Sequence, residues 1–153
     1  MEKRLLLASP HMSDEGYEME YIQDAFRKNW IAPLGENVTE FEKAMAAYMG
    51  QGYPVALSAG TAALHLSMLQ AGVHPGDTVF CQSLTFSASA NPIVYCGAKP
   101  VFIDSERDTW NMDPAALRRA LELYGRPSAV VVVHLYGNPA KLGEITSICE
   151  EYN

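Results

Sequence analysis

The spacing of hydrophobic side chains divides this sequence into a helical front part and an alternating remainder. In the front part, apolar side chains recur at helical intervals over residues 17–30 and again over residues 41–49. Ser13 lies before the first periodic stretch and is typical of a helix cap, while Gly50 is typical of a helix end. The Pro- and Gly-containing segment Ile31–Gly35 predicts a loop between two helices.

After residue 50, short apolar runs alternate with amphipathic stretches, and glycines stand at most of the joints. Four consecutive valines within residues 129–134 are typical of a strand that is buried on both faces. The alternation predicts a mostly parallel sheet with helices on both faces, which is the α/β class. The expected strands cover residues 54–58, 77–82, 99–104 and 129–134, and the expected helices cover residues 61–71, 87–96, 113–125 and 140 onwards.

Composition and charge narrow the class of function. The 153 residues are 48% hydrophobic and 19% charged, as in globular domains, and the net charge of −7 without a Lys/Arg cluster argues against nucleic-acid binding. No apolar run reaches the roughly 18–20 residues of a membrane helix, and the stretch after Lys3-Arg4 is too short for a signal peptide. Cys81, Cys96 and Cys149 lie in apolar stretches and are interpreted as buried free thiols, which favours the cytoplasm.

The strongest candidate for ligand binding is the turn Ser58–Leu64, between an expected strand and an expected helix. Ligands of open parallel sheets bind beyond the carboxyl ends of the strands. Small residues let the backbone approach an anion, the first helical N–H groups attract it, and Thr61 adds a hydroxyl donor. A tight turn whose small residues serve packing alone remains the alternative. The turn matches neither the P-loop pattern nor the dinucleotide-binding pattern.

Two further strand ends carry candidate side chains. Phe86 follows the second expected strand and is either a stacking partner for a flat heteroaromatic cofactor or an ordinary core side chain. His134 ends the valine-rich strand and is either a functional side chain or a hydrogen-bonded core histidine. His65 and His74 show no metal-ligand spacing, and the acidic segment Asp104–Asp108 is interpreted as a solvated turn.

Five segments follow one another along the chain in an order that is typical of one family. They are Ser58–Leu66, Gly72–Asp77, Leu84–Phe86, Gly97–Asp104 and His134–Ala140. The ordered set resembles the DegT/DnrJ/EryC1/StrS sugar aminotransferases, which use pyridoxal phosphate and have the aspartate-aminotransferase fold (fold type I). At the front, Leu7–Met12 and Asn29–Gly35 are similar to the branch that aminates UDP-2-acetamido-4-keto-2,4,6-trideoxyhexose in bacterial glycan and protein-glycosylation pathways.

The resemblance implies roles for individual residues. Gly60, Thr61 and Ala62 would hold the cofactor phosphate, and Phe86 would stack on the pyridine ring. Ala59 departs from the Ser or Asn that the family more often has before this turn, which removes one side-chain donor. The nucleotide-sugar would contact Asn29, Trp30, Ile31, Ala32 and Gly60, with His134 as a further candidate.

The resemblance also implies an organisation. Residues 1–50 would form a helical, substrate-loop segment, and residues 51–153 part of the cofactor-binding large domain. Glutamate would be the amino donor and a homodimer the assembled state. The Schiff-base lysine of the family lies beyond residue 153, and the chain's five lysines match no such motif, so this chain alone is not expected to catalyse transamination. These lysines are Lys3, Lys28, Lys43, Lys99 and Lys141. A Rossmann-type nucleotide-binding module and a non-catalytic remnant are the alternatives.

Overall fold

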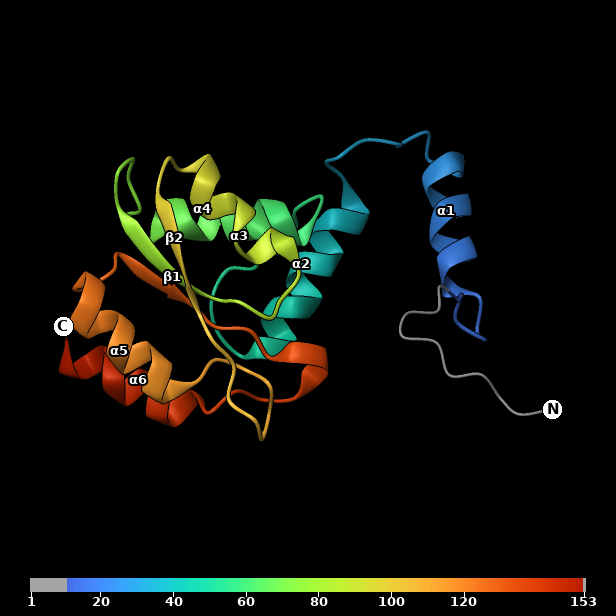
Figure 1. Cartoon of the computed structure of the whole chain (residues 1–153). Helices are drawn as coiled ribbons and strands as arrows, with labels where there is room; N and C mark the ends of the chain where they lie inside the picture. Colours follow the sequence, from blue (N-terminus) through green and yellow to red (C-terminus); the bar gives the residue numbers. More distant parts are fainter. Residues whose placement is uncertain (1–10, 153) are drawn as a thin grey trace. The chain divides into compact units, whose positions relative to one another are not determined.

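The computed structural model describes residues 11–152 and divides the chain into two compact units, Met1–Ala56 and Leu57–Asn153 (Figure 1). The Lys3-Arg4 pair and residues 7–10 of the front motif lie outside the described residues. None of the helices in the described part is long and apolar enough to cross a membrane.

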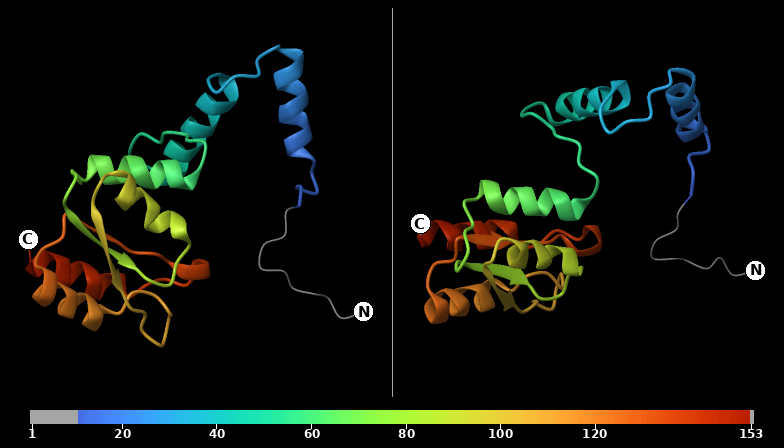
Figure 2. Two further views of the ribbon diagram at one scale, coloured as in Figure 1. Left: turned by 45° about the horizontal axis from the view of Figure 1, so that its top comes forward. Right: turned by 90° about the horizontal axis from the view of Figure 1, so that it is seen from above.

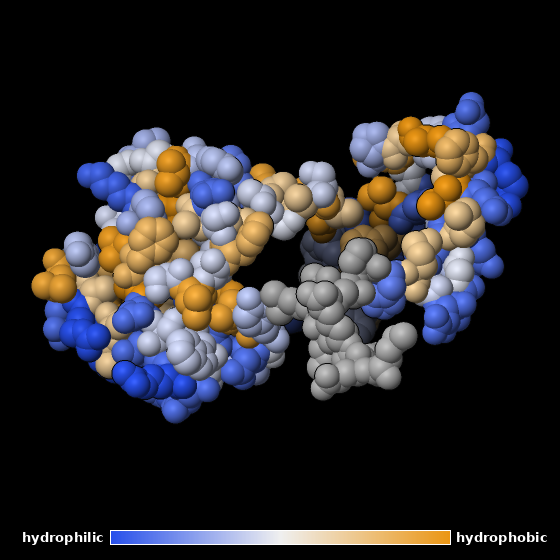
Figure 3. Space-filling model, turned by 45° about the vertical axis from the view of Figure 1, so that its right-hand side comes forward, coloured by the Kyte–Doolittle hydropathy of each residue, from blue (hydrophilic) through white to orange (hydrophobic). Residues whose placement is uncertain are grey.

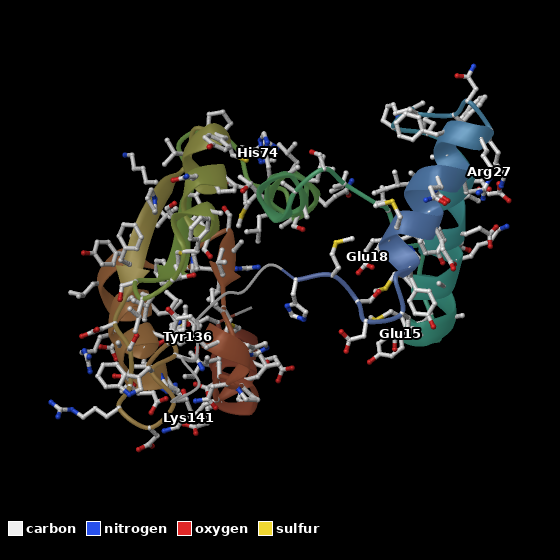
Figure 4. The ribbon with its side chains drawn as sticks, turned by 90° about the vertical axis from the view of Figure 1, so that its right-hand side faces the viewer. Glu15, Glu18, Arg27, His74, Tyr136 and Lys141 are labelled. Carbon is white, nitrogen blue, oxygen red and sulfur yellow. The ribbon has the colours of Figure 1, made fainter. Side chains whose placement is uncertain are left out.

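Unit 1 consists of two helices, α1 (Tyr17–Arg27) and α2 (Glu36–Met49). Helix α1 begins later than expected, because Gly16 in the left-handed region (φ 75°) occupies the cap position. Ser13 still organises this start: its hydroxyl donates to Glu18 at 2.6 Å and accepts from the N–H of Tyr17 at 3.3 Å. The hydrogen bonds from Ser13 lower the pKa of the Glu18 carboxyl, which lies in the first turn of α1 (Figure 4).

The two helices of unit 1 bury none of their residues. Large apolar side chains such as Phe26, Ile31 and Leu34 are exposed instead, and apolar surface is visible on this unit in Figure 3. An isolated helix of 11–14 residues is marginally stable in water and gains most of its stability by packing an apolar face. Unit 1 therefore presents apolar surface that a packing partner would cover.

Unit 2 contains the predicted parallel sheet, with strands β1 (Thr78–Gln82), β2 (Lys99–Ile103) and β3 (Ala129–Val131) in the order β2-β1-β3. Both neighbours pair with β1 in parallel. The prediction of a strand over residues 54–58 is wrong: the segment is not a strand, and Val55 and Leu57 are exposed. A sequence with strand character needs a neighbouring strand for its backbone hydrogen bonds, and none of the three described strands pairs with it.

Helices cover both faces of this sheet, as expected (Figure 2). On one face, α5 (Pro114–Tyr124) and α6 (Leu142–Glu151) pack on Phe80 and Ile103. On the other face, α3 (Gly60–Gln70) and α4 (Asn91–Tyr95) pack on Val79 and Cys81. The central strand β1 thus contributes alternate residues to two separate cores.

The helix expected over residues 87–96 is divided in the structure. A short 3-10 turn, η1 (Ser87–Ser89), precedes α4, and a proline follows directly in the first turn of that helix. Pro92 has no N–H and cannot continue a helical hydrogen-bond ladder from the preceding turn. The helix therefore starts anew at Asn91.

The three cysteines are free, as expected, with Cys81 and Cys96 buried and Cys149 half-buried. Burial raises the pKa of the Cys81 thiol to about 11. Cys81 is therefore a protonated core side chain at neutral pH.

Helix α5 allows a test of the predicted cap. The Asp113 carboxylate accepts from the N–H of Ala115 at 2.8 Å, and Pro114 stands in the first turn. Replacing Asp113 with Ala should lower the free energy of unfolding by about 1 kcal/mol, because the cap bond and its favourable charge at the helix start are both lost. Urea unfolding followed by circular dichroism measures this. The control Glu122→Ala, on the exposed side of the same helix, should change stability by less than about 0.5 kcal/mol. Equal effects of the two variants would contradict the assignment.

Candidate functional site

A cleft of about 360 Å³ lies at the carboxyl ends of β1 and β3, beside the start of α3. Its walls come from three segments of unit 2 that are distant in sequence. They include Gly60, Thr61 and Leu64; Thr85, Phe86, Ala88 and Ser89; and Val133, His134, Leu135 and Tyr136. The structure therefore brings together residues of the three segments that the sequence indicated as ligand-binding candidates.

The start of α3 forms the first wall. The N–H groups of Gly60 and Thr61 stand in the first turn of α3 and have no acceptor within the helix, and the cap residue Ala59 supplies no side-chain acceptor either. Apart from its chain neighbours and the nearby backbone of its own helix, no atom of the described residues lies within 4 Å of the position that a Cβ on Gly60 would occupy, so a ligand can approach this backbone. The N–H of Ala62 donates to the carbonyl of Ala59 at 3.0 Å, and Ala62 does not line the cleft. Its role as a phosphate ligand stays a prediction.

Phe86 forms the second wall, directly after β1. Its side chain is 79% exposed, so it is not the core phenylalanine that was the alternative. The hydroxyl groups of Thr85 and Ser89 hydrogen-bond to each other at 2.8 Å across the turn that carries it. An exposed ring on a short, internally bonded turn is suited to stacking on a flat ligand.

His134 and Tyr136 form the third wall, after β3. His134 is exposed, and its Nδ1 accepts from the N–H of Ala140 at 3.0 Å. In the neutral ring the proton therefore lies on Nε2, which leaves this nitrogen as a donor. Tyr136 lies in the left-handed region (φ 53°) within the 3-10 turn η2 (Leu135–Gly137), and its ring is 80% exposed.

A pair of buried amides lies at these same strand ends, and the sequence did not reveal it. Gln82 and Asn111 are both fully buried and hydrogen-bond to each other at 3.3 Å, although 29 residues separate them. The only sequence signal was a glutamine at the end of an apolar strand, where an aliphatic residue would be ordinary. Asn111 itself gave no signal, because its position before the α5 cap is typical of a surface turn.

The acidic segment between β2 and α5 is more ordered than the solvated turn that was expected. The Glu106 carboxylate accepts hydrogen bonds from the Thr109 hydroxyl and from the N–H groups of Asp108 and Thr109, and lies 3.2 Å from the ammonium group of Lys141. These contacts lower the pKa of Glu106 to about 2, and the hydrogen bond from the Thr109 hydroxyl has the largest effect. The N–H of Glu106 donates to the carbonyl of Asn111 at 2.9 Å, so this turn helps to fix the backbone of Asn111 beside Gln82.

The predicted substrate residues Asn29–Ala32 belong to unit 1. Asn29 adopts a left-handed conformation (φ 51°), and the Trp30 indole donates to the carbonyl of Leu34. A methyl group on Gly35 would overlap the same indole. Trp30 and Ala32 line a hollow of about 340 Å³ within this unit. The loop is thus organised around Trp30, which is 58% exposed, and substrate contact stays a prediction.

Comparison with known proteins decides the family. The sequence profile of the DegT/DnrJ/EryC1/StrS aminotransferase family matches residues 12–153. The chain belongs to this family. The resemblance carried by the five ordered segments is confirmed at that level, and a Rossmann-type module is set aside.

The relatives agree in sequence and in fold. EpsN of Bacillus subtilis, assigned as a pyridoxal phosphate-dependent aminotransferase, is 54% identical over 99% of this chain and 40% of its own length. A GDP-perosamine synthase of Caulobacter vibrioides is 38% identical over 98% of this chain and 39% of its own. Sugar aminotransferase Spr1654 from Streptococcus pneumoniae, solved in its PLP form, has a TM-score of 0.83 at 28% identity, over 97% of this chain and 37% of its own. The chain spans about 40% of the length of these curated relatives.

The comparisons support the fold and the cofactor more closely than the substrate. Neighbours in PLP and PMP forms confirm pyridoxal phosphate as the cofactor at the level of the family, and the fold as part of the fold type I architecture. The relatives are named for different sugars, among them GDP-perosamine and UDP-2-acetamido-2-deoxy-3-oxo-D-glucuronate. The narrower trideoxyhexose assignment is therefore not confirmed.

The lowered pKa of Glu106 predicts acid sensitivity of the turn that carries Asn111. The stability that Glu106 contributes is present above its ordinary pKa of 4.5 and is lost as pH falls towards its folded pKa of about 2. Unfolding measured by urea titration between pH 6 and about pH 2 should show this loss. Glu106→Gln should flatten the profile in that window, whereas Glu144→Gln, on the first turn of α6, should leave it unchanged. A Glu106→Gln profile that matches the wild type would contradict this cause.

Proposed function

We propose that this chain supplies part of the cofactor and substrate sites of a sugar aminotransferase. The reaction transfers an amino group from glutamate to C4 of a UDP-linked 4-keto-6-deoxy amino sugar. The observation that carries this proposal is the single cleft in which the α3 start, Phe86 and His134 meet. The whole protein is proposed to be a homodimer, because unit 1 leaves its apolar side chains exposed. The three free thiols favour the cytoplasm as its location.

The described residues fit pyridoxal phosphate. The N–H groups of Gly60 and Thr61 and the positive end of the α3 dipole are suited to a phosphate dianion, with the Thr61 hydroxyl as a further donor. The exposed Phe86 ring is suited to the flat face of the pyridine. The bound cofactor would supply an electron sink for amino transfer. The residues of this chain would grip it, orient its ring and shield one face from water.

The cleft contains no lysine of the described residues. Lys28 pairs with Asp24 and Glu36, Lys43 pairs with Glu40, and Lys141 pairs with Glu106 and Asp108. Lys99 lies on β2, and neither it nor the paired lysines line the cleft. The proposed role of residues 11–152 is therefore binding and orientation, and His134 Nε2–H is a donor for a polar group of the substrate.

The substrate part of the proposal rests on unit 1. Trp30 presents an exposed indole beside a hollow, on a loop that its own hydrogen bond to Leu34 organises. An aromatic ring beside a hollow is suited to the base or the sugar ring of a nucleotide-sugar. The similarity of Asn29–Gly35 to one branch of the family supports a UDP-linked sugar.

The Thr61 hydroxyl provides the test of the phosphate site. Thr61→Val keeps the side-chain volume and removes the donor, so affinity for pyridoxal phosphate should fall roughly tenfold or more, as expected for a lost bond to a charged group. Absorbance titration of the purified chain measures the affinity. Thr146→Val, on α6 and outside the cleft, is the matched control and should bind as the wild type does. Unchanged affinity in Thr61→Val would remove the hydroxyl from the site, and a wild-type chain that binds no cofactor would support the non-catalytic remnant instead.

Trp30 provides the test of the substrate loop. Trp30→Ala should weaken binding of a UDP-linked sugar roughly three- to tenfold, which is the loss expected for one aromatic contact. Calorimetric titration with UDP-N-acetylglucosamine and with a GDP-linked sugar measures both affinity and base preference. Tyr53→Ala removes an even more exposed ring from the same unit and should have no effect. Tighter binding of the GDP-linked sugar would contradict the proposed nucleotide.

A further inference from the structure

Buried polar side chains gather at the cleft end of unit 2. Among residues 11–152, the polar side chains that are buried are Gln82, Ser89 and Asn111. Ser89 lines the cleft, Gln82 ends the strand that leads to Phe86, and Asn111 precedes α5 and hydrogen-bonds to Gln82. Burying an amide costs free energy unless its hydrogen bonds are made. The hydrogen-bond partners of a buried amide therefore indicate which segments of the chain it joins.

Gln82 connects the end of β1 to the start of α5. Its Nε2 donates to the carbonyl of Leu84 at 2.9 Å, and its Oε1 accepts from the N–H of Met112 at 2.9 Å. The third bond, from Nε2 to Asn111 Oδ1 at 3.3 Å, uses the second N–H of this amide group. Leu84 stands two residues before Phe86, so Gln82 holds the base of the second cleft wall.

Asn111 connects the same point to the segment after β3. Its Oδ1 accepts from the N–H of Leu135 at 2.8 Å, and its Nδ2 donates to the carbonyl of Asn138 at 2.8 Å. Leu135 lies between His134 and Tyr136, the two exposed rings of the third wall. Asn111 therefore holds both ends of the turn that carries these rings.

These amide bonds act where the sheet has ended. Strand β3 ends at Val131, so no sheet ladder holds the backbone of Leu135. The half-buried N–H of Leu135 needs a partner other than a strand, and the Asn111 side chain supplies it. The apolar cores on the two faces of the sheet need no such bonds for packing, because their contacts are aliphatic and aromatic.

We propose that Gln82 and Asn111 are positioning residues that set the separation of the Phe86 wall and the His134 wall for cofactor binding. The inference rests on the proposed function for its consequence, but the positioning itself is a property of the chain alone. Neither residue lines the cleft, and both act through hydrogen bonds to the backbone of Leu84 and Leu135.

The first measurement compares the pyridoxal phosphate affinity of two amide variants with that of a variant destabilised elsewhere in unit 2. Gln82→Met and Asn111→Leu keep approximate volume and remove the hydrogen bonds, and both should weaken pyridoxal phosphate binding roughly tenfold. Leu121→Ala, buried in the α5 core away from the cleft, serves as a control whose loss of stability has no positioning consequence. Its affinity should equal that of the wild type. Unchanged affinity in both amide variants, or an equal loss in the control, would overturn the proposal.

The second measurement needs no cofactor and separates this inference from the proposed function. Hydrogen exchange of the Leu135 amide should accelerate at least tenfold in Asn111→Leu, while the amide of Leu117, bonded to the Asp113 carbonyl at 2.9 Å, should not change. A wild-type chain that does not bind pyridoxal phosphate would defeat the proposed function and leave this result to decide the positioning. If Asn111→Leu does not fold, Asn111→Asp replaces it. The aspartate keeps the acceptor for Leu135, so its Leu135 amide should stay protected, and an exposed amide there would overturn the role of Asn111.

Discussion

The candidate site depends on one buried contact, the hydrogen bond between the amides of Gln82 and Asn111. Through it, the end of the central strand is joined to the start of α5 and to the segment after β3. These connections are distant in sequence and meet only at the carboxyl edge of the sheet. An unpaired buried amide is costly, so the pair favours the one arrangement in which each donor and acceptor is satisfied. Phe86 and His134 both lie in the lining of the cleft at this edge.

The packing of the helices in unit 2 follows from the central position of β1 in the sheet. Both faces of this strand are buried, Phe80 towards α5 and α6, and Val79 and Cys81 towards α3 and α4. Parallel pairing on both edges brings the carboxyl ends to one side, where α3 also starts. The N–H groups of Gly60 and Thr61 and the helix dipole therefore face the same cleft as the aromatic walls. The family to which the chain belongs uses a phosphate-bearing flat cofactor, and this combination of features is suited to it.

Unit 1 differs from unit 2 in how little apolar surface it buries. Its helices bury no residues, and the loop between them is organised by a single indole, that of Trp30. An amphipathic helix pair without its own core gains stability only when another surface covers it. The proposed cofactor contacts lie in unit 2, where two apolar clusters pack on the sheet and a cleft opens at its carboxyl edge, and the proposed substrate contacts and assembly surface lie in unit 1.

The sequence by itself determined most of the helices, three parallel strands, the helix start at Gly60 and the family, because these depend on local periodicity, caps and ordered motifs. The Asp113 cap of α5 is one such local feature, and it is found as predicted. Only the tertiary structure decided that residues 54–58 have no strand partner among the described strands and that Asn111 is buried. Both outcomes depend on which distant segments meet, and a hydrogen bond across 29 residues leaves no periodic trace in the sequence.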